Sequence, residues 1–274
     1  MKNVKQEWTK PEIRFVITHY KKGHGRAAIG KMFRQKFGSS RTENSIRHCI
    51  ETHGQDVERD LPRVLLVDIE TKPKKFWAWG VWQQDLSHNM MIEEGAILSW
   101  SAKWLGESAN KIMYKDQRGN EKNLLNDKKL MLPLSKLLDQ ADLVIWQHGD
   151  SFDYGEINNR FAEHDIEIPG EYKTIDTKKI AKRHIRLPWY SLSYMTERFN
   201  KKYKKQSHEE FPGFSLWDAC MKGNRKAWNC MKKYNQFDVL SMEELFVNTL
   251  AKFAKGNARV AAAMRTYNAS LKKK

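Results

Sequence analysis

Four consecutive apolar residues, Val64 to Val67, run directly into the alternating segment Asp68-Ile69-Glu70. An apolar run of this length predicts a strand that is buried on both faces at the centre of a sheet. Asp68 and Glu70 are two positions apart, so both carboxylates emerge on the same face of an extended chain. Two adjacent carboxylates repel each other and are costly to bury unless a cation neutralises them. A hard divalent metal ion would do so, although a pair of acids at a strand end also arises by chance.

The pattern of the chain changes at about residue 63. From there on, short apolar strands alternate with amphipathic helices, which predicts an α/β fold with a mixed β-sheet flanked by helices. The predicted strands are 64–68, 76–83, 96–104, 111–114 and 143–146, and the predicted helices are 128–140, 154–164, 177–183, 192–199 and 224–249.

Residues 1–54 are predicted to form a small all-helical module. Thr9 and Pro11 mark a helix start, and Gly23 and Gly25 break that helix. Two more short amphipathic segments follow, and the third is basic, which is typical of a helix-turn-helix. The tryptophan of the first helix and the segment RTENSIRH resemble Myb/SANT-like and phage-type helix-turn-helix modules. The alternative is a helical cap that packs on the main domain.

The predicted domain plan follows from these patterns. Residues 1–54 form the helical module, 55–63 a polar linker, 64–254 the α/β domain and 255–274 a basic C-terminal tail. The apolar runs are far shorter than the ~18 residues that a membrane span needs, and the N-terminus lacks the pattern of a secretory signal. Three scattered cysteines do not suggest a disulfide framework. We therefore expect a cytoplasmic location, with no secretion and no membrane partner.

The charge of the chain points to a polyanionic partner. Lys and Arg number 49 against 33 Asp and Glu, which gives a formal net charge of +16. Such an excess predicts nucleic acid as the simplest partner. A soluble basic protein without a polyanionic partner is the alternative.

Two further acidic clusters follow apolar segments. The strand 143–146 leads into Gly149-Asp150-Ser151-Phe152-Asp153, where the acids could also simply cap the next helix. The third cluster lies in a long helical pattern, where Tyr234 and Asp238 are four positions apart and therefore neighbours on one face. An acid beside a phenol on a buried helix face is unusual for core packing alone.

Taken together, DIET, GDSFD and YNQFD resemble the three motifs of the DEDD superfamily of 3′–5′ exonucleases, which have an RNase H-like fold. The tyrosine four residues before the last aspartate is similar to the tyrosine (DEDDy) subfamily. The resemblance covers residues 63 to about 249 and is strongest to the phage and bacterial branch near the proofreading domains of B-family polymerases. It implies a bacterial or phage-infected cell as the setting.

The resemblance also implies roles for particular residues. Tyr234 would orient water, and His148 stands where the family often has asparagine, a change that bears on substrate contacts. The metal-binding acids would be Asp68, Glu70, Asp153 and Asp238.

Phosphodiester hydrolysis explains these residue types independently. Two divalent cations activate the attacking water and neutralise the leaving oxygen, and all-oxygen ligands suit Mg²⁺ or Mn²⁺ rather than zinc. Asp68 would bridge the two ions, Glu70 and Asp238 would complete the first site, and Asp153 would support the second. A phenol with a pKa of about 10 serves better as a positioner of water than as a base.

The predicted function is a metal-dependent 3′–5′ exonuclease, with DNA favoured over RNA as the substrate. The predicted nucleic-acid contacts are Arg41, Asn44, Arg47 and His48 of the third helix, His148, and the lysines Lys201, Lys202, Lys204 and Lys205. Arg41, Asn44 and His48 would share one helix face. Two alternatives remain at this point: an RNase H-like endonuclease or resolvase, and a DNA-binding regulator with a degenerate nuclease domain.

Five tryptophans on the predicted strands allow two interpretations. Alternating aromatic residues on strands are usually core or cross-strand pairs, but they can also stack on nucleobases. The residues are Trp77, Trp79, Trp82, Trp100 and Trp104.

Overall fold

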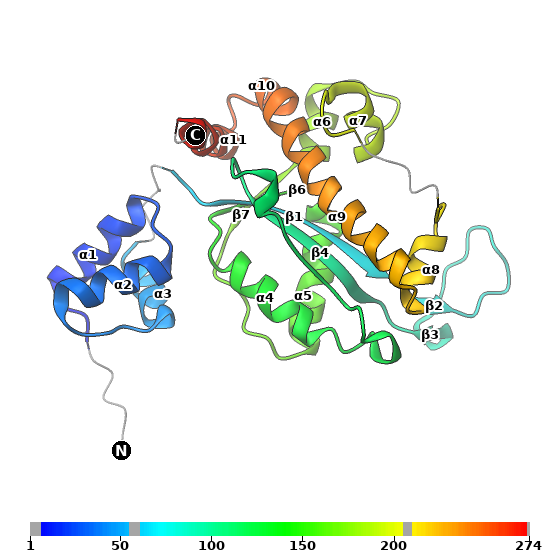
Figure 1. Cartoon of the computed structure of the whole chain (residues 1–274), viewed down its shortest axis with the longest axis horizontal. Helices are drawn as coiled ribbons and strands as arrows, with labels where there is room; N and C mark the ends of the chain where they lie inside the picture. Colours follow the sequence, from blue (N-terminus) through cyan, green and yellow to red (C-terminus); the bar gives the residue numbers. More distant parts are fainter. Residues whose placement is uncertain (1–6, 55–60, 205–209, 273–274) are drawn as a thin grey trace, which may run out of the picture.

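The computed structural model describes residues 7–54, 61–204 and 210–272. Within these ranges, five strands form one sheet in the order β5-β4-β1-β6-β7 (Figure 1). The central strand pairs antiparallel with β4 and parallel with β6, so the sheet is mixed. The strands are β1 (Val64–Lys72), β4 (Ala96–Trp104), β5 (Met113–Asp116), β6 (Leu143–Trp146) and β7 (Lys173–Asp176), and a separate hairpin pairs β2 (Lys75–Phe76) with β3 (Met91–Glu93).

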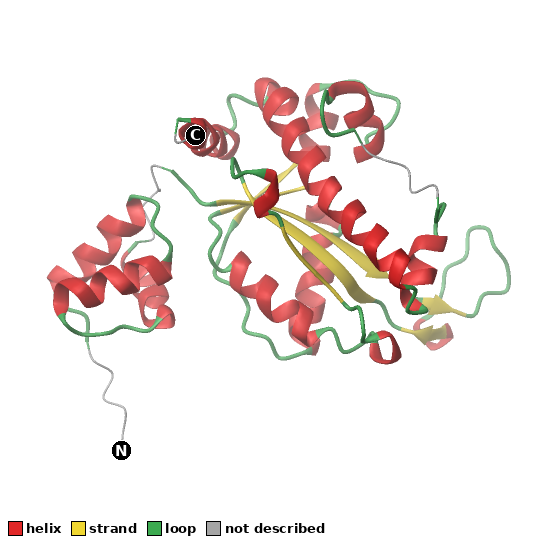
Figure 2. Ribbon diagram, viewed as in Figure 1, coloured by secondary structure: helices red, strands yellow, loops and turns green. Residues whose placement is uncertain are grey.

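Helices cover both faces of the sheet, as Figure 2 shows. Alternate residues of β1 separate two cores: Leu65 and Val67 pack with α4 (Lys128–Leu138) and α5 (Asp153–Glu163), whereas Val64 and Leu66 pack on the side of α9. This arrangement confirms the predicted α/β fold. The other helices of this part are α6 (Thr177–His184), α7 (Leu192–Phe199), α8 (Ser215–Met221), α9 (Arg225–Leu245), α10 (Ala251–Phe253) and α11 (Ala258–Leu271), with a π-turn at Phe246–Leu250 and 3-10 turns at His88–Met90, Ala109–Lys111, Glu121–Asn123 and Gly149–Ser151.

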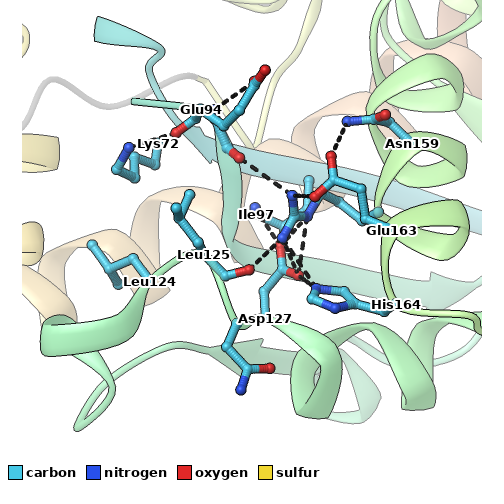
Figure 3. Close-up of polar contacts among 12 residues, drawn as sticks. Lys72, Glu94, Ile97, Leu124, Leu125, Asp127, Asn159, Glu163 and His164 are labelled. Atoms are coloured by element: carbon cyan, nitrogen blue, oxygen red, sulfur yellow. Dashed lines mark hydrogen bonds and ion pairs between the residues drawn. The ribbon is translucent and has the colours of Figure 1, made fainter. Parts of the chain in front are cut away.

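A buried ionic network joins α5 to the start of β4 (Figure 3). Arg160 of α5 donates from Nε to Asp127 at 2.9 Å, and both side chains are almost fully buried. Asp127 also accepts the backbone N–H of Ile97 at 2.8 Å and contacts His164 Nε2 at 2.5 Å. Arg160 further contacts Glu163 and the carbonyl of Leu125. Because Asp153 is the first residue of α5, this network fixes the helix that carries it.

Three helices precede the sheet: α1 (Lys10–Lys21), α2 (Arg26–Phe37) and α3 (Glu43–His53). Thr9 caps α1 in a capping box with Glu12, which confirms the predicted helix start, and Thr42 caps α3. The three helices share a small core of their own. They contact the rest of the chain through polar groups: Arg26 pairs with Asp139, and the Tyr20 hydroxyl donates to Asp142 at 3.1 Å.

The long helix predicted over 224–249 is observed as α9 with a continuous π-helical turn at Phe246–Leu250. Two local predictions are wrong. The predicted strand 76–83 ends at Phe76, because the following residues leave the hairpin as a loop. The stretch expected as a basic tail contains α11, which buries Val260 and Ala263 against the core.

Where the chain is described, its helices are too short or too polar to cross a membrane.

Candidate metal centre

Asp68 and Glu70 lie on β1, on the face that α9 covers. They continue the alternation of Val64 and Leu66, whose side chains pack beneath α9. Pairing of β1 with β4 places Asp68 opposite Ser101 and Glu70 opposite Ser99. The backbone that carries both acids is therefore held in register on one side.

Helix α9 brings the third acid to this face. Asp238 is buried, and carboxylate oxygens of Asp68, Glu70 and Asp238 all lie within 4.8 Å of one another. Three carboxylates at this spacing repel one another in a poorly solvated site, and a hard divalent cation with oxygen ligands would relieve the repulsion. The donor set thus fits a metal ion of the magnesium type.

Two side chains that the sequence analysis did not identify hold these acids in place. Asn235 Nδ2 donates to Asp68 Oδ2 at 2.5 Å and receives a hydrogen bond from Ser99 through its Oδ1 at 3.2 Å. Trp217 of α8 donates from Nε1 to Glu70 Oε2 at 3.1 Å. Asn235 lies inside the YNQFD motif, which was the one sequence signal for it, whereas no sequence signal identified Trp217.

Tyr234 lies one helical turn before Asp238 on α9. Its ring packs edge-on against Trp217, with 5.8 Å between the ring centroids. The phenol, Trp217 and Glu70 are thereby linked in one group of contacts. Tyr234 and Asp238 therefore lie four positions apart in one helix, as the sequence pattern predicted, and Tyr234 contacts the indole that donates to Glu70.

Asp153, the fourth predicted acid, contacts the backbone of β1 from the N-terminus of α5. It is the first residue of α5, it is buried, and its carboxylate accepts the backbone N–H of Ile69, which stands between Asp68 and Glu70. Burial, and secondarily the nearby Asp176, raises the pKa of Asp153 to about 7. Asp153 is not part of the three-acid group, but it lies next to the strand that supports it.

Comparison with protein-family models matches residues 101–250 to the RNase H superfamily. The chain belongs to the RNase H superfamily. The matched range contains Asp153, Tyr234 and Asp238, whereas Asp68 and Glu70 precede it.

Among solved structures, this RNase H-superfamily chain is similar to the family B DNA polymerase from the hyperthermophilic archaeon Pyrobaculum calidifontis. The TM-score is 0.44 and the sequence identity 11%, over 74% of this chain and 27% of the polymerase chain. The chain therefore spans about a quarter of the polymerase's length. No curated protein sequence gave a significant match.

In the turn between β6 and α5, Asp150 has a structural role, whereas Asp153 lies beside the strand of the metal centre. Asp150 accepts from Trp146 Nε1 and pairs with Lys179, each at 2.7 Å, so it stabilises the turn. Gly149 is required there, because a Cβ atom would lie 2.2 Å from the Trp146 ring. His148 is exposed with a left-handed φ of 65°, and its N–H donates to Asp176.

The lysine run lies on the surface of the same domain. Lys201, Lys202 and Lys204 are exposed, and the backbone N–H groups of Lys201, Lys202 and Tyr203 all donate to Glu244. The side chains of these lysines extend from a backbone that is fixed to α9. Lys205 lies outside the described residues.

The predicted contact face of the third helix is wrong in part. Arg41 precedes α3, which begins at Glu43, so it does not share a helix face with Asn44 and His48. Its guanidinium is almost fully buried, pairs with Glu12 at 3.2 Å and stacks on Trp8.

Arg47 is also engaged within the chain. It pairs with Glu167 at 2.9 Å and lies 3.8 Å from Asp139, and both acids belong to the sheet-containing part. Asn44 and His48 are the exposed members of the predicted set.

The raised pKa of Asp153 gives a testable pH dependence. Folded Asp153 keeps its proton up to about pH 7, whereas an ordinary aspartate loses it near 3.8. The folded state therefore binds more protons between these values, and its stability falls as pH rises through this window, by up to about 1.4 kcal/mol per unit. We expect the melting temperature in EDTA to fall correspondingly from about pH 4 to about pH 7. Asp153→Asn should flatten this slope and be more stable than wild type above pH 7; equal slopes would contradict the assignment.

Proposed function

We propose that this chain is a metal-dependent 3′–5′ exonuclease of the tyrosine subfamily, which hydrolyses phosphodiester bonds in DNA. The observation that carries the proposal is the convergence of Asp68, Glu70 and Asp238 on one face of β1 and α9, with Tyr234 one turn away. Membership of the RNase H superfamily supports hydrolysis of nucleic acid as the reaction class. The net charge of +16 supports a polyanionic substrate.

Each residue of the centre has a role in this proposal. Two Mg²⁺ or Mn²⁺ ions, when bound, would supply charge neutralisation and an acidic water, and Asp68, Glu70, Asp153 and Asp238 would hold them. The Tyr234 hydroxyl orients the attacking water by hydrogen bonding. Asn235 fixes the rotamer of Asp68, and Trp217 fixes that of Glu70. Preorganised ligands avoid the cost of ordering them at each turnover.

The remaining parts of the proposal concern the surroundings of the site. We propose that residues 1–54 form a helix-turn-helix-like module that recruits nucleic acid through Asn44 and His48, that 55–63 form a linker, and that 64–254 form the nuclease domain. His148 and the exposed lysines at 201, 202 and 204 are proposed to contact the phosphate backbone. Three cysteines without disulfides support action in the cytoplasm of a bacterial or phage-infected cell.

A 5′-labelled single-stranded oligonucleotide tests polarity and metal dependence together. We expect a ladder that shortens one nucleotide at a time from the 3′ end with Mg²⁺ or Mn²⁺, and no reaction in EDTA. A circular single strand should resist the enzyme. Cleavage of the circle would instead establish the endonuclease alternative, and no hydrolysis of either substrate would favour a regulator. RNA of the same sequence, run in parallel, decides the sugar preference.

Tyr234→Phe tests the tyrosine subfamily. The variant keeps the ring that packs on Trp217 and loses the hydroxyl, so turnover should fall about tenfold or more while metal affinity is unchanged. Single-turnover kinetics at saturating Mg²⁺ measure the first quantity, and a Mn²⁺ titration measures the second. A wild-type rate would make Tyr234 a packing residue.

A further inference from the structure

The loop between β2 and β3 exposes three indole rings. Trp77, Trp79 and Trp82 have 71%, 96% and 83% of their surface exposed, and Val81 beside them is 87% exposed. Other tryptophans are buried and satisfied: Trp100 and Trp228 are in the core, and their Nε1 groups donate to Leu130 O and Glu121. Trp189 is also exposed, at 65%, but it stands alone in the sequence, whereas the loop carries three exposed indoles within six residues. Contiguous exposed apolar surface of this kind marks a binding site rather than a feature of folding.

The loop is ordered by its polar groups, not by its tryptophans. Trp77 N–H donates to Met90 O at 2.9 Å, which closes the base of the loop. Gln84 folds back, donates from Nε2 to Trp82 O at 2.8 Å, and lies 3.1 Å from where a Cβ atom of Gly80 would be. The indoles are thus presented on a braced loop, which lowers the entropy cost of using them for binding.

The loop continues the strand that carries the acids. Trp77 is seven residues beyond Glu70, so at ~3.5 Å per residue its backbone lies within about 25 Å of the metal centre, a span of a few nucleotides. The tip, 77–84, has no charged side chain. Lysines at its base are paired, Lys75 with Glu93 at 2.6 Å and Lys74 with Glu94 at 3.6 Å. Any affinity of the tip therefore comes from its aromatic faces rather than from charge.

We propose that Trp77, Trp79 and Trp82 stack on the bases of a single-stranded stretch of the nucleic acid whose end is in the metal centre. The inference rests on the proposed function, because it makes the loop part of the substrate path. Single-stranded nucleic acid fits better than an apolar protein or a lipid surface, since indole faces stack on any base and the loop is continuous with the catalytic strand. Phosphate attraction is left to the basic surface of the rest of the chain.

Fluorescence anisotropy of a labelled single-stranded oligonucleotide in EDTA tests the proposal without hydrolysis. The triple variant Trp77→Ala, Trp79→Ala, Trp82→Ala should bind at least about 5- to 150-fold more weakly, which is the loss expected for a single stacked base at ~1–3 kcal/mol. The slope of log affinity against log salt should not change, because no phosphate contact is lost. An oligonucleotide with abasic sites should lose affinity for wild type but not for the variant.

Matched substitutions distinguish stacking from apolar docking. The triple Trp→Phe variant keeps aromatic faces and should retain most of the affinity, whereas the triple Trp→Leu variant keeps apolar surface and should bind as weakly as the alanine variant. Leucine that restores binding, or alanine that binds as wild type does, would overturn the proposal. Circular dichroism verifies that each variant is folded.

Hydrolysis is measured separately with Mg²⁺. A chain that does not hydrolyse but shows the tryptophan-dependent binding in EDTA would refute the exonuclease and leave the stacking loop standing. A chain that hydrolyses DNA but binds it equally well without the tryptophans would support the exonuclease and refute the stacking loop.

Discussion

Asp68→Ala is expected to lower hydrolysis of a single-stranded oligonucleotide by about a thousandfold or more. Asp68 belongs to the three-acid group, within 4.8 Å of oxygens of Glu70 and Asp238, and in the proposed function it would contact both ions. Loss of several kcal/mol of metal-derived stabilisation in the transition state corresponds to this factor, since each 1.36 kcal/mol is tenfold. Asp238→Ala should have a similar effect. Initial rates over a range of Mg²⁺ concentrations are the measurement.

Two further variants separate charge from shape. Asp68→Asn has the size of aspartate and can still pair with Asn235, so a comparable loss of activity would identify charge as the essential property. Asp150→Asn is the matched control: its side chain pairs with Lys179 in the neighbouring turn, and hydrolysis should stay near the wild-type rate. Wild-type turnover in purified Asp68→Ala and Asp238→Ala would rule out the two-metal proposal.

Asp127→Ala should destabilise the sheet-containing part by about 3–5 kcal/mol. It leaves the guanidinium of Arg160 buried without its main carboxylate partner and removes the acceptor of the Ile97 N–H (Figure 3). Urea unfolding, followed by circular dichroism, measures the loss.

Three further variants serve as comparisons for the Asp127–Arg160 pair: Arg160→Met, the double variant, and Lys222→Ala at an exposed ion pair. Arg160→Met should cost a similar amount, and the double variant less than the sum of the two, because both single changes break the same pair. Lys222→Ala breaks an exposed pair with Asp218 and should leave the midpoint of unfolding almost unchanged. A loss below about 1 kcal/mol for Asp127→Ala would show that solvent reaches the network.

Several elements could be predicted because they depend on local pattern. The strands 96–104 and 143–146 match the observed bounds, since continuous apolar runs between turn residues are a local signal. The alternation of Asp68 and Glu70 and the helical spacing of Tyr234 and Asp238 likewise place each pair on one face without knowledge of the fold. What brings the two pairs together is the packing of α9 on β1.

The features that sequence did not reveal depend on contacts between distant segments. Trp217 reaches Glu70 across 147 positions, and no local pattern encodes that pairing. The sequence showed that Arg47 is basic, but it could not show that Glu167, 120 positions later, pairs with it. The tryptophans of 77–82 have strand propensity, yet the loop finds no partner strand among the described residues, so composition gave the wrong element.

The separation of the acids along the chain has a consequence for synthesis. Asp68 emerges from the ribosome early, whereas Asn235, which orients it, follows 167 positions later, together with Asp238. At ~5–20 residues per second, translation of the intervening segment takes about 10–30 s. A metal centre built in this way is incomplete until α9 docks on the sheet, so the proposed activity arises only after synthesis has passed Asp238.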